Sequence, residues 1–234
     1  MISPIPFNKN TKIQLAHKTN GIEFFNGEEL QRIFDYVRAK IRDDRQHEAY
    51  HRRYYLLMKA LLHTGARIEE IVPFHKDAYL DEKGRMHREI SSPGLRPVDF
   101  DLDLNTVRIP TLKKHTTNGK LPERVLPLSA EMEDEYKSYL LFTKTDLKGK
   151  DPLFPITRVA VNLYMKKMQD HIGIKIHPHK FRHTFAVSCV LSNVPLSVLQ
   201  QWMAHSSLVI TSIYTQVTGM DTSRYMQQVN FGGI

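Results

Sequence analysis

Residues 177–215 read HPHKFRHTFAVSCVLSNVPLSVLQQWMAHSSLVITSIYT. The apolar positions at the start of this stretch recur at helical spacing, and Pro178 stands where the first turn of a helix tolerates proline. A break at residues 193–195 separates a second short helix, which ends before His205. Two serines after His205 can cap a third helix, which carries Tyr214. We therefore expect three short helices joined by tight turns.

Four side chains in this stretch can do chemistry. His179 and Arg182 are three positions apart and lie on one face of a helix. His205 lies in the second turn, and Tyr214 lies on the third helix. Taken singly, a histidine in a turn is usually a cap, and a tyrosine near a chain end is usually a surface side chain. The ordered set points instead to one site containing two imidazoles, a guanidinium and a phenol.

The set resembles the C-terminal half of the tyrosine recombinases, the phage integrase family, which carry H-x-L-R-H-T-x-A, then L-G-H-S-S, then Y-T. Here these motifs read H-K-F-R-H-T-F-A at residues 179–186, M-A-H-S-S at 203–207 and Y-T at 214–215. His205 follows Arg182 by 23 positions and Tyr214 follows His205 by 9, as in the family.

Two positions depart from the family pattern. Ala204 replaces the glycine, and alanine tolerates a positive φ poorly, so the turn before His205 is expected to differ in detail. Phe181 replaces the leucine, which is a change of volume in the core.

Composition bounds the class of protein. The 234 residues are 41% hydrophobic and 25% charged, as in ordinary globular proteins, and a net charge of +8 favours a polyanionic partner. The sequence contains no apolar run of about 20 residues, so a membrane partner is not expected. Cys189, the single cysteine, is expected to be a buried thiol. The first ten residues lack the pattern of a signal peptide, which predicts a cytoplasmic protein.

The N-terminal sequence predicts where the catalytic domain begins. Residues 1–25 are predicted to be a tail or linker, and 26–218 the catalytic domain. Asn26 and Glu29 have the spacing of a capping box, and the pattern F-x-x-x-E-L at 25–30 resembles the first helix of the recombinase catalytic domain. Most family members carry a helical DNA-clamping domain before it. This chain is therefore either a fragment or a short member without that domain.

A second motif lies upstream. An apolar helix that begins near residue 54 is predicted to end at Gly65, and T-G-A-R-I-E-E at 64–70 resembles the first arginine motif of the family. Arg67 and Glu70 at i, i+3 could instead form a surface pair. The buried helix that leads into Arg67 favours the functional interpretation. Glu70 is then expected to orient a neighbouring cationic side chain.

The middle of the chain is expected to form a small sheet. Residues 75–97 have no clear period and look like an insertion, whereas 98–105 alternate and predict a strand. A second strand from residue 106, an Asn-Gly turn and a returning strand at 124–128 resemble the hairpin that carries the family's catalytic lysine. Lys113 fits that position best, but Lys114 points to the other face of the strand and remains an alternative.

Two further helices are predicted at 129–142 and 159–172. In the first helix, the side chains expected to face inward are Met132, Tyr136, Leu140 and Leu141. The apolar side chains of the second helix are Val161, Leu163, Tyr164 and Met168. Residues 219–234 form a short amphipathic tail, which the resemblance suggests is exchanged between protomers.

The resemblance implies a mainly helical α+β catalytic fold with a small antiparallel sheet at one edge. It also implies a site-specific recombinase or integrase that cleaves and rejoins DNA strands through a 3′-phosphotyrosyl intermediate, without metal, ATP or other cofactor. Double-stranded DNA and a dimer to tetramer of the chain on DNA are the expected partners. By resemblance, Arg67, Arg182 and His205 bind the scissile phosphate, Tyr214 is the nucleophile, His179 the base, Lys113 the acid, and His183 and Glu70 support them.

Four other kinds of site or protein share some of these residues. His177, His179 and His183 could bind a metal, but no carboxylate is near them in sequence. A relaxase-type nuclease also uses H-x-H and a tyrosine, but with a divalent metal and without the two arginine motifs. A DNA-binding module that has lost catalysis would not keep every catalytic residue type. A type IB topoisomerase shares the chemistry and differs in motif spacing.

Overall fold

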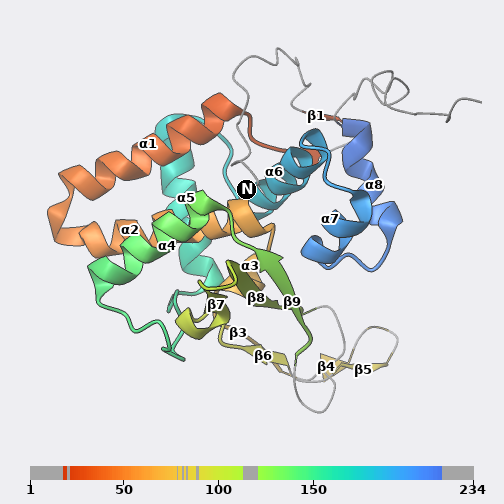
Figure 1. Ribbon diagram of the computed structural model, residues 1–234. Helices are drawn as coiled ribbons and strands as arrows, with labels where there is room; N and C mark the ends of the chain where they lie inside the picture. The colour runs from red at the N-terminus through yellow and green to blue at the C-terminus, as the bar shows by residue number, and fades with distance from the viewer. Residues whose placement is uncertain are drawn as a thin grey trace, which may run out of the picture.

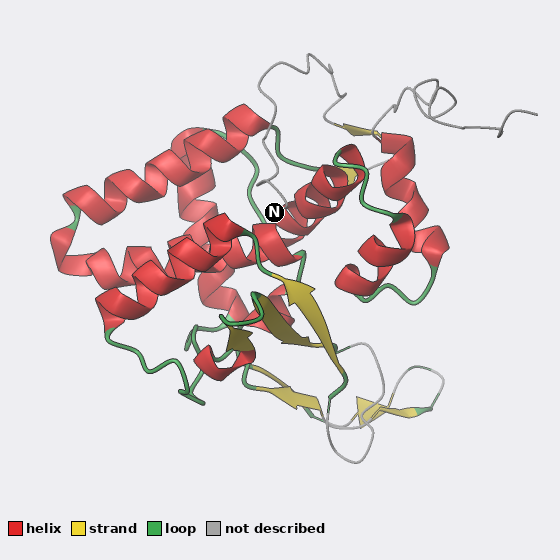
Figure 2. Ribbon diagram, viewed as in Figure 1, coloured by secondary structure: helices red, strands yellow, loops and turns green. Residues whose placement is uncertain are grey.

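Helices make up most of the described residues, and most of the strands lie together at one edge, below the helices in Figure 2. The computed structural model describes residues 18–19, 22–77, 79–80, 82, 84–87, 90–112 and 121–217. The helices are α1 Gly27–Asp43, α2 Glu48–Thr64, α3 Ile68–Ile71, α4 Ala130–Thr143, α5 Arg158–Ile172, α6 Pro178–Leu191, α7 Leu196–Met203 and α8 Leu208–Val217. The strands are β1 Lys18–Thr19, β2 Ile22–Glu23, β3 Phe74–Lys76, β4 Tyr79–Leu80, β5 Met86–His87, β6 Ile90–Ser92, β7 Phe100–Asp101, β8 Thr106–Pro110 and β9 Glu123–Pro127. The expectation of a mainly helical α+β protein is confirmed.

The helix ends follow local chemistry. The predicted capping box is present: the Asn26 side chain accepts from the Glu29 N–H at 2.8 Å, and the Glu29 carboxylate accepts from the Asn26 N–H at 3.0 Å. Gly65 ends α2 with a φ of 58°. A Cβ at Gly65 would lie 2.3 Å from the Phe185 ring, so both the backbone angle and the packing require glycine there.

Helix α2 forms the centre of the core. It packs against α1, α4 and α6, and its residues Leu57, Met58 and Leu61 have no exposed surface. Within the described part of the chain, no helix has both the length and the apolar character needed to cross a membrane.

One of the predicted inward positions is wrong, because Leu141 in α4 is 81% exposed. Leu163, one of the apolar residues of α5, is also 55% exposed. The buried face of α4 is formed by Met132, Tyr136, Tyr139 and Leu140, and that of α5 by Val161, Tyr164, Met165 and Met168. Both sets follow the i, i+3, i+4, i+7 spacing of one helix face, or a close variant of it, and Leu141 and Leu163 fall beside that face.

The sheet has three antiparallel strands in the order β7-β8-β9, with Arg108 of β8 opposite Val125 of β9. The predicted strand over 98–105 is mostly wrong, because only Phe100 and Asp101 are extended. The Asp101 carboxylate accepts from the backbone N–H of Asp103 and Leu104, at 3.2 and 2.9 Å. An aspartate that bonds its own backbone in this way forms a turn, which explains why the alternation was misleading.

The stretch expected to be an insertion contains regular structure that its sequence did not suggest. Strand β3 pairs antiparallel with β6, and β4 pairs antiparallel with β5. These two short ladders extend from the same end of the molecule as β8 and β9 (Figure 1).

The last three described helices fold as predicted and form a second hydrophobic cluster. Side chains of α6, α7 and α8 pack on one another, and Cys189 is a buried thiol, as expected. Within the stretch expected to be a tail or linker, Ile22 and Phe24 are buried in this cluster, and Phe25 joins the main core. The cluster places Tyr214 of α8 against α6.

Candidate active site

Arg182 is fixed by two backbone carbonyls from distant parts of the chain. One terminal nitrogen of its guanidinium donates to the carbonyl of Gly65, at the end of α2, and the other donates to Met203 at 2.7 Å, at the end of α7. These carbonyls are free to accept because the last turn of a helix leaves them without a helical partner. Burial lowers the pKa of Arg182 to about 10, and the positive charge of Arg67 adds to the effect. The group stays cationic at neutral pH.

Arg67 lies at the start of α3 and is held by Glu70. Its backbone N–H donates to one oxygen of the Glu70 carboxylate at 2.9 Å, and its guanidinium donates to the other at 3.2 Å. The Glu70 side chain is fully buried, whereas that of Arg67 is 17% exposed. Both oxygens of Glu70 therefore contact Arg67.

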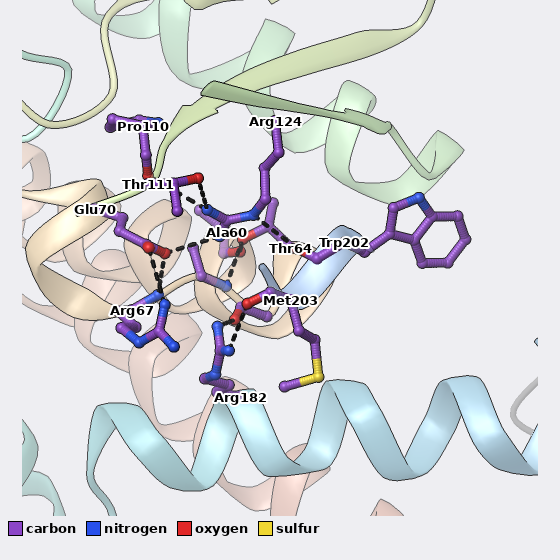
Figure 3. Close-up of polar contacts among 12 residues, drawn as sticks. Ala60, Thr64, Arg67, Glu70, Pro110, Thr111, Arg124, Arg182, Trp202 and Met203 are labelled. Carbon is purple, nitrogen blue, oxygen red and sulfur yellow. Dashed lines mark hydrogen bonds and ion pairs between the residues drawn. The ribbon is translucent and has the colours of Figure 1, made fainter. Parts of the chain in front are cut away.

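Arg124 of β9 also binds Glu70, and the sequence analysis did not identify it. Its guanidinium donates to the Glu70 carboxylate at 2.8 Å and to the carbonyl of Trp202 at 2.7 Å (Figure 3). Burial alone would raise the pKa of Glu70, but the charge and hydrogen bond of Arg124, together with Arg67, lower it. The signal was present in the strand: Arg124 lies two positions before the buried Leu126 and therefore on the same face.

The residue before His205 has a left-handed backbone although it is an alanine and not a glycine. Ala204 ends α7 with φ 48° and ψ 47°, the conformation that a glycine would adopt more easily. The His205 N–H donates to the carbonyl of Gln200 at 3.0 Å, and its Nδ1 lies 3.0 Å from the hydroxyl of the buried Thr211. These contacts fix the imidazole beside α8. Its ring is nearly parallel to that of Tyr214, at an angle of 7° with centroids 6.4 Å apart.

Tyr214 is buried, with 2% of its surface exposed, and its hydroxyl lies 3.0 Å from Nδ1 of His183. Burial raises the pKa of the Tyr214 phenol, and the charges of Arg182 and Arg67 oppose that effect. His179 lies edge to face against His183, with ring centroids 4.7 Å apart. The structure thus brings Tyr214 close to both arginines and to the histidine pair of α6.

Burial lowers the pKa of His183 to about 4, and the neighbouring His179 and Arg182 add to this effect. At neutral pH the His183 imidazole is therefore uncharged and has one nitrogen that can accept a proton. It can accept the hydrogen bond of the Tyr214 hydroxyl.

Lys113, the predicted general acid, lies outside the described residues, and so do Lys114 and the predicted Asn-Gly turn. The strands on either side of that turn are β8, which ends at Pro110, and β9, which begins at Glu123. Among the residues that the structure describes, no three histidine, cysteine or acidic side chains are grouped so as to hold a metal ion.

Arg67, Arg182, His179, His183, His205 and Tyr214 come from four elements and meet in one place. Two guanidinium groups can bind the nonbridging oxygens of a phosphate in a bidentate manner. A phenol beside them can attack the phosphorus, and imidazoles can move its proton. The set suits phosphoryl transfer to a tyrosine.

The chain is similar to known proteins in both sequence and fold. The sequence profile of the phage integrase family matches residues 23–220. Tyrosine recombinase XerA of Pyrococcus furiosus is 30% identical over 151 residues, which make up 61% of this chain and 49% of that protein. The chain thus spans about half the length of this curated relative.

Two solved structures show the same fold. The catalytic domain of bacteriophage HP1 integrase matches 88% of this chain and 94% of its own, with 16% identity and a TM-score of 0.54. The Tn1549 transposon integrase in complex with circular intermediate DNA matches 87% of this chain and 64% of its own, with 17% identity and a TM-score of 0.57.

Proposed function

The chain belongs to the phage integrase family, and from that premise we propose that it cleaves and rejoins DNA strands as a site-specific tyrosine recombinase. The observation that carries the proposal is the position of Tyr214. Both Arg67 and Arg182 lie near enough to lower the pKa of its phenol against the effect of burial. A phenol near two fixed guanidinium groups is the arrangement that attack on a phosphodiester requires.

The reaction follows from the residues. Arg67 and Arg182 bind the nonbridging oxygens of the scissile phosphate and stabilise the charge that develops there. The Tyr214 hydroxyl attacks the phosphorus, its proton passes to a histidine of α6, and the bond from phosphorus to the 5′-oxygen breaks. The resemblance assigns the base to His179, and His183 holds the hydroxyl in the free protein.

Lys113 then supplies a proton to the leaving 5′-oxygen. The product is a 3′-phosphotyrosyl ester, which the 5′-hydroxyl of another strand can attack in the reverse sense. Because one phosphate ester replaces another, the reaction needs neither ATP nor a metal ion.

The remaining parts of the proposal concern the assembly. Residues 26–218 form the catalytic domain. Residues 219–234, which lie outside the described residues together with residue 218, dock on a neighbouring protomer when a dimer to tetramer assembles on DNA. A photoactivatable crosslinker at Tyr225 should then join two chains on DNA. Crosslinks within one chain alone, at every protein and DNA concentration, would refute this exchange. The partner is the cell's double-stranded DNA, so the protein acts in the cytoplasm.

The proposal is tested with a pool of nicked duplexes of random sequence, incubated with the protein in EDTA. The nick lets the short cleaved fragment diffuse away, so that a covalent complex accumulates. We expect protein joined to 3′-ends. Binding without any adduct would favour a DNA-binding module that has lost catalysis, and an adduct that requires Mg²⁺ would favour a relaxase.

A further inference from the structure

We propose that Arg124 is a positioning residue that sets the distance and orientation of Arg67 relative to Arg182. This inference rests on the proposed function, because it concerns the two groups that would bind the scissile phosphate. The family resemblance includes the returning strand at 124–128 but assigned no role to Arg124. It lies in β9, on the strand that returns from the lysine hairpin.

The contacts of Arg124 reach three separate parts of the chain. Its Nη2 donates to Glu70 at 2.8 Å and its Nε to the carbonyl of Trp202 at 2.7 Å. Its Nη1 donates to the carbonyl of Pro110 and to the hydroxyl of Thr111, both at 3.3 Å. A guanidinium group has five N–H donors in a rigid planar fork, so four contacts fix it in one orientation.

These contacts connect the two catalytic arginines. Glu70 accepts from both Arg124 and Arg67. At the other side, the carbonyl of Trp202 accepts from Arg124, and the carbonyl of the next residue, Met203, accepts from Arg182 (Figure 3). An unbroken path of hydrogen bonds and one peptide unit therefore runs from Arg67 through Glu70 and Arg124 to Arg182.

Arg124 does not itself have the geometry of a phosphate ligand. Its side chain is 8% exposed, compared with 17% for Arg67, and all three of its nitrogens donate to protein oxygens. Its effect on the reaction must therefore pass through the groups that it holds. Because a displacement of about 1 Å in a catalytic group can reduce a rate about 100-fold, loss of this connection should reduce the rate of cleavage.

The experiment compares Arg124→Met and Arg124→Lys with two controls. Arg108→Met changes the arginine of the adjacent strand, which is exposed and donates to the carbonyl of Val98. Lys59→Met removes a buried lysine paired with Glu131 on α4, and so measures what destabilisation alone does. Each variant is tested at a temperature at which its circular dichroism shows that it is folded. The substrate is a nicked duplex recovered from the random pool.

We expect both Arg124 variants to form the adduct about 100-fold more slowly at saturating DNA, with little change in DNA affinity. A second substrate carries a neutral methylphosphonate at the scissile position. Because its reaction needs less charge neutralisation by the two arginines, the defect of the Arg124 variants should shrink on it. A structural role would reduce the rates on both substrates alike.

An equal defect on both substrates, a defect that Lys59→Met reproduces, or no defect at all would overturn the inference. If Arg124→Met does not fold, Thr111→Val removes a single acceptor of Arg124 and should give a smaller defect with the same preference for the neutral substrate. An absence of adduct with the unaltered protein would instead refute the proposed function, so the two failures are distinguishable.

Discussion

The hydroxyl of Tyr214 lies 3.0 Å from Nδ1 of His183, so the proposed nucleophile is held by the second histidine of the H-K-F-R-H motif. His183 is uncharged at neutral pH, because its burial and the neighbouring His179 and Arg182 lower its pKa to about 4. In the free protein the phenol thus lies against a neutral imidazole, away from solvent.

The low pKa of His183 predicts a dependence of stability on pH. In the unfolded chain a histidine takes up a proton near pH 6.5, whereas the folded protein keeps His183 neutral down to about pH 4. Between these values the unfolded state binds more protons, so the free energy of unfolding should decrease as the pH falls. His183→Gln should make that decrease less steep in denaturant titrations. The exposed His47 serves as control, and an equal slope in His183→Gln and His47→Gln would contradict the prediction.

Glu70 should contribute more to stability than its sequence neighbour. Glu70→Gln leaves the guanidinium groups of Arg67 and Arg124 without their shared carboxylate, and breaking such a buried pair costs about 3–5 kcal/mol. Glu69 pairs with Arg158, whose side chain is 59% exposed, so Glu69→Gln should cost less than about 1 kcal/mol. Equilibrium unfolding measures both, and equal values would show that the buried network adds nothing.

Ala204 should be a site at which glycine stabilises the protein. Its left-handed backbone costs a residue with a Cβ about 1–2 kcal/mol, so Ala204→Gly should gain about 1 kcal/mol. Ala160, inside α5, is the matched control: there Ala160→Gly should lose about 0.5–1 kcal/mol. Thermal unfolding distinguishes the two. A loss at both positions would mean that the left-handed residue carries no strain.

The role of Lys113 can be separated from that of Lys114 by the leaving group. Lys113→Ala should slow cleavage about 10²–10⁴-fold, because general acid catalysis is worth roughly that much. A substrate with sulfur at the bridging 5′ position needs no proton and should restore cleavage to Lys113→Ala but not to Arg182→Ala. If the sulfur substrate instead restores cleavage to Lys114→Ala, the general acid is Lys114.

The sequence predicted those parts of the fold that depend on neighbouring residues. The capping box of Asn26, the glycine at residue 65 and the proline at 178 each act within one turn of a helix. Helix ends could therefore be placed before the structure was known. The two arginine motifs, the histidines and Tyr214 were found by resemblance, and the structure brings together those that it describes.

What the sequence did not predict depends on contacts between distant residues or on side chains that bond their own backbone. Arg124 is buried and Val125 is 57% exposed, the reverse of what their polarity suggests, because Glu70 supplies a charge 54 positions away. The alternation at 98–105 was misread because Asp101 forms a turn instead of continuing a strand. The pairing of β3 with β6 likewise joins two segments without a periodic pattern.

The most direct test of the account is the identity of the residue that becomes attached to DNA. The adduct formed in EDTA is digested with nuclease and protease, and mass spectrometry locates the remaining nucleotide. The account predicts the nucleotide on Tyr214, and it predicts that Tyr214→Phe binds the same DNA without forming an adduct. A nucleotide on any other residue, or an adduct that persists in Tyr214→Phe, would contradict it.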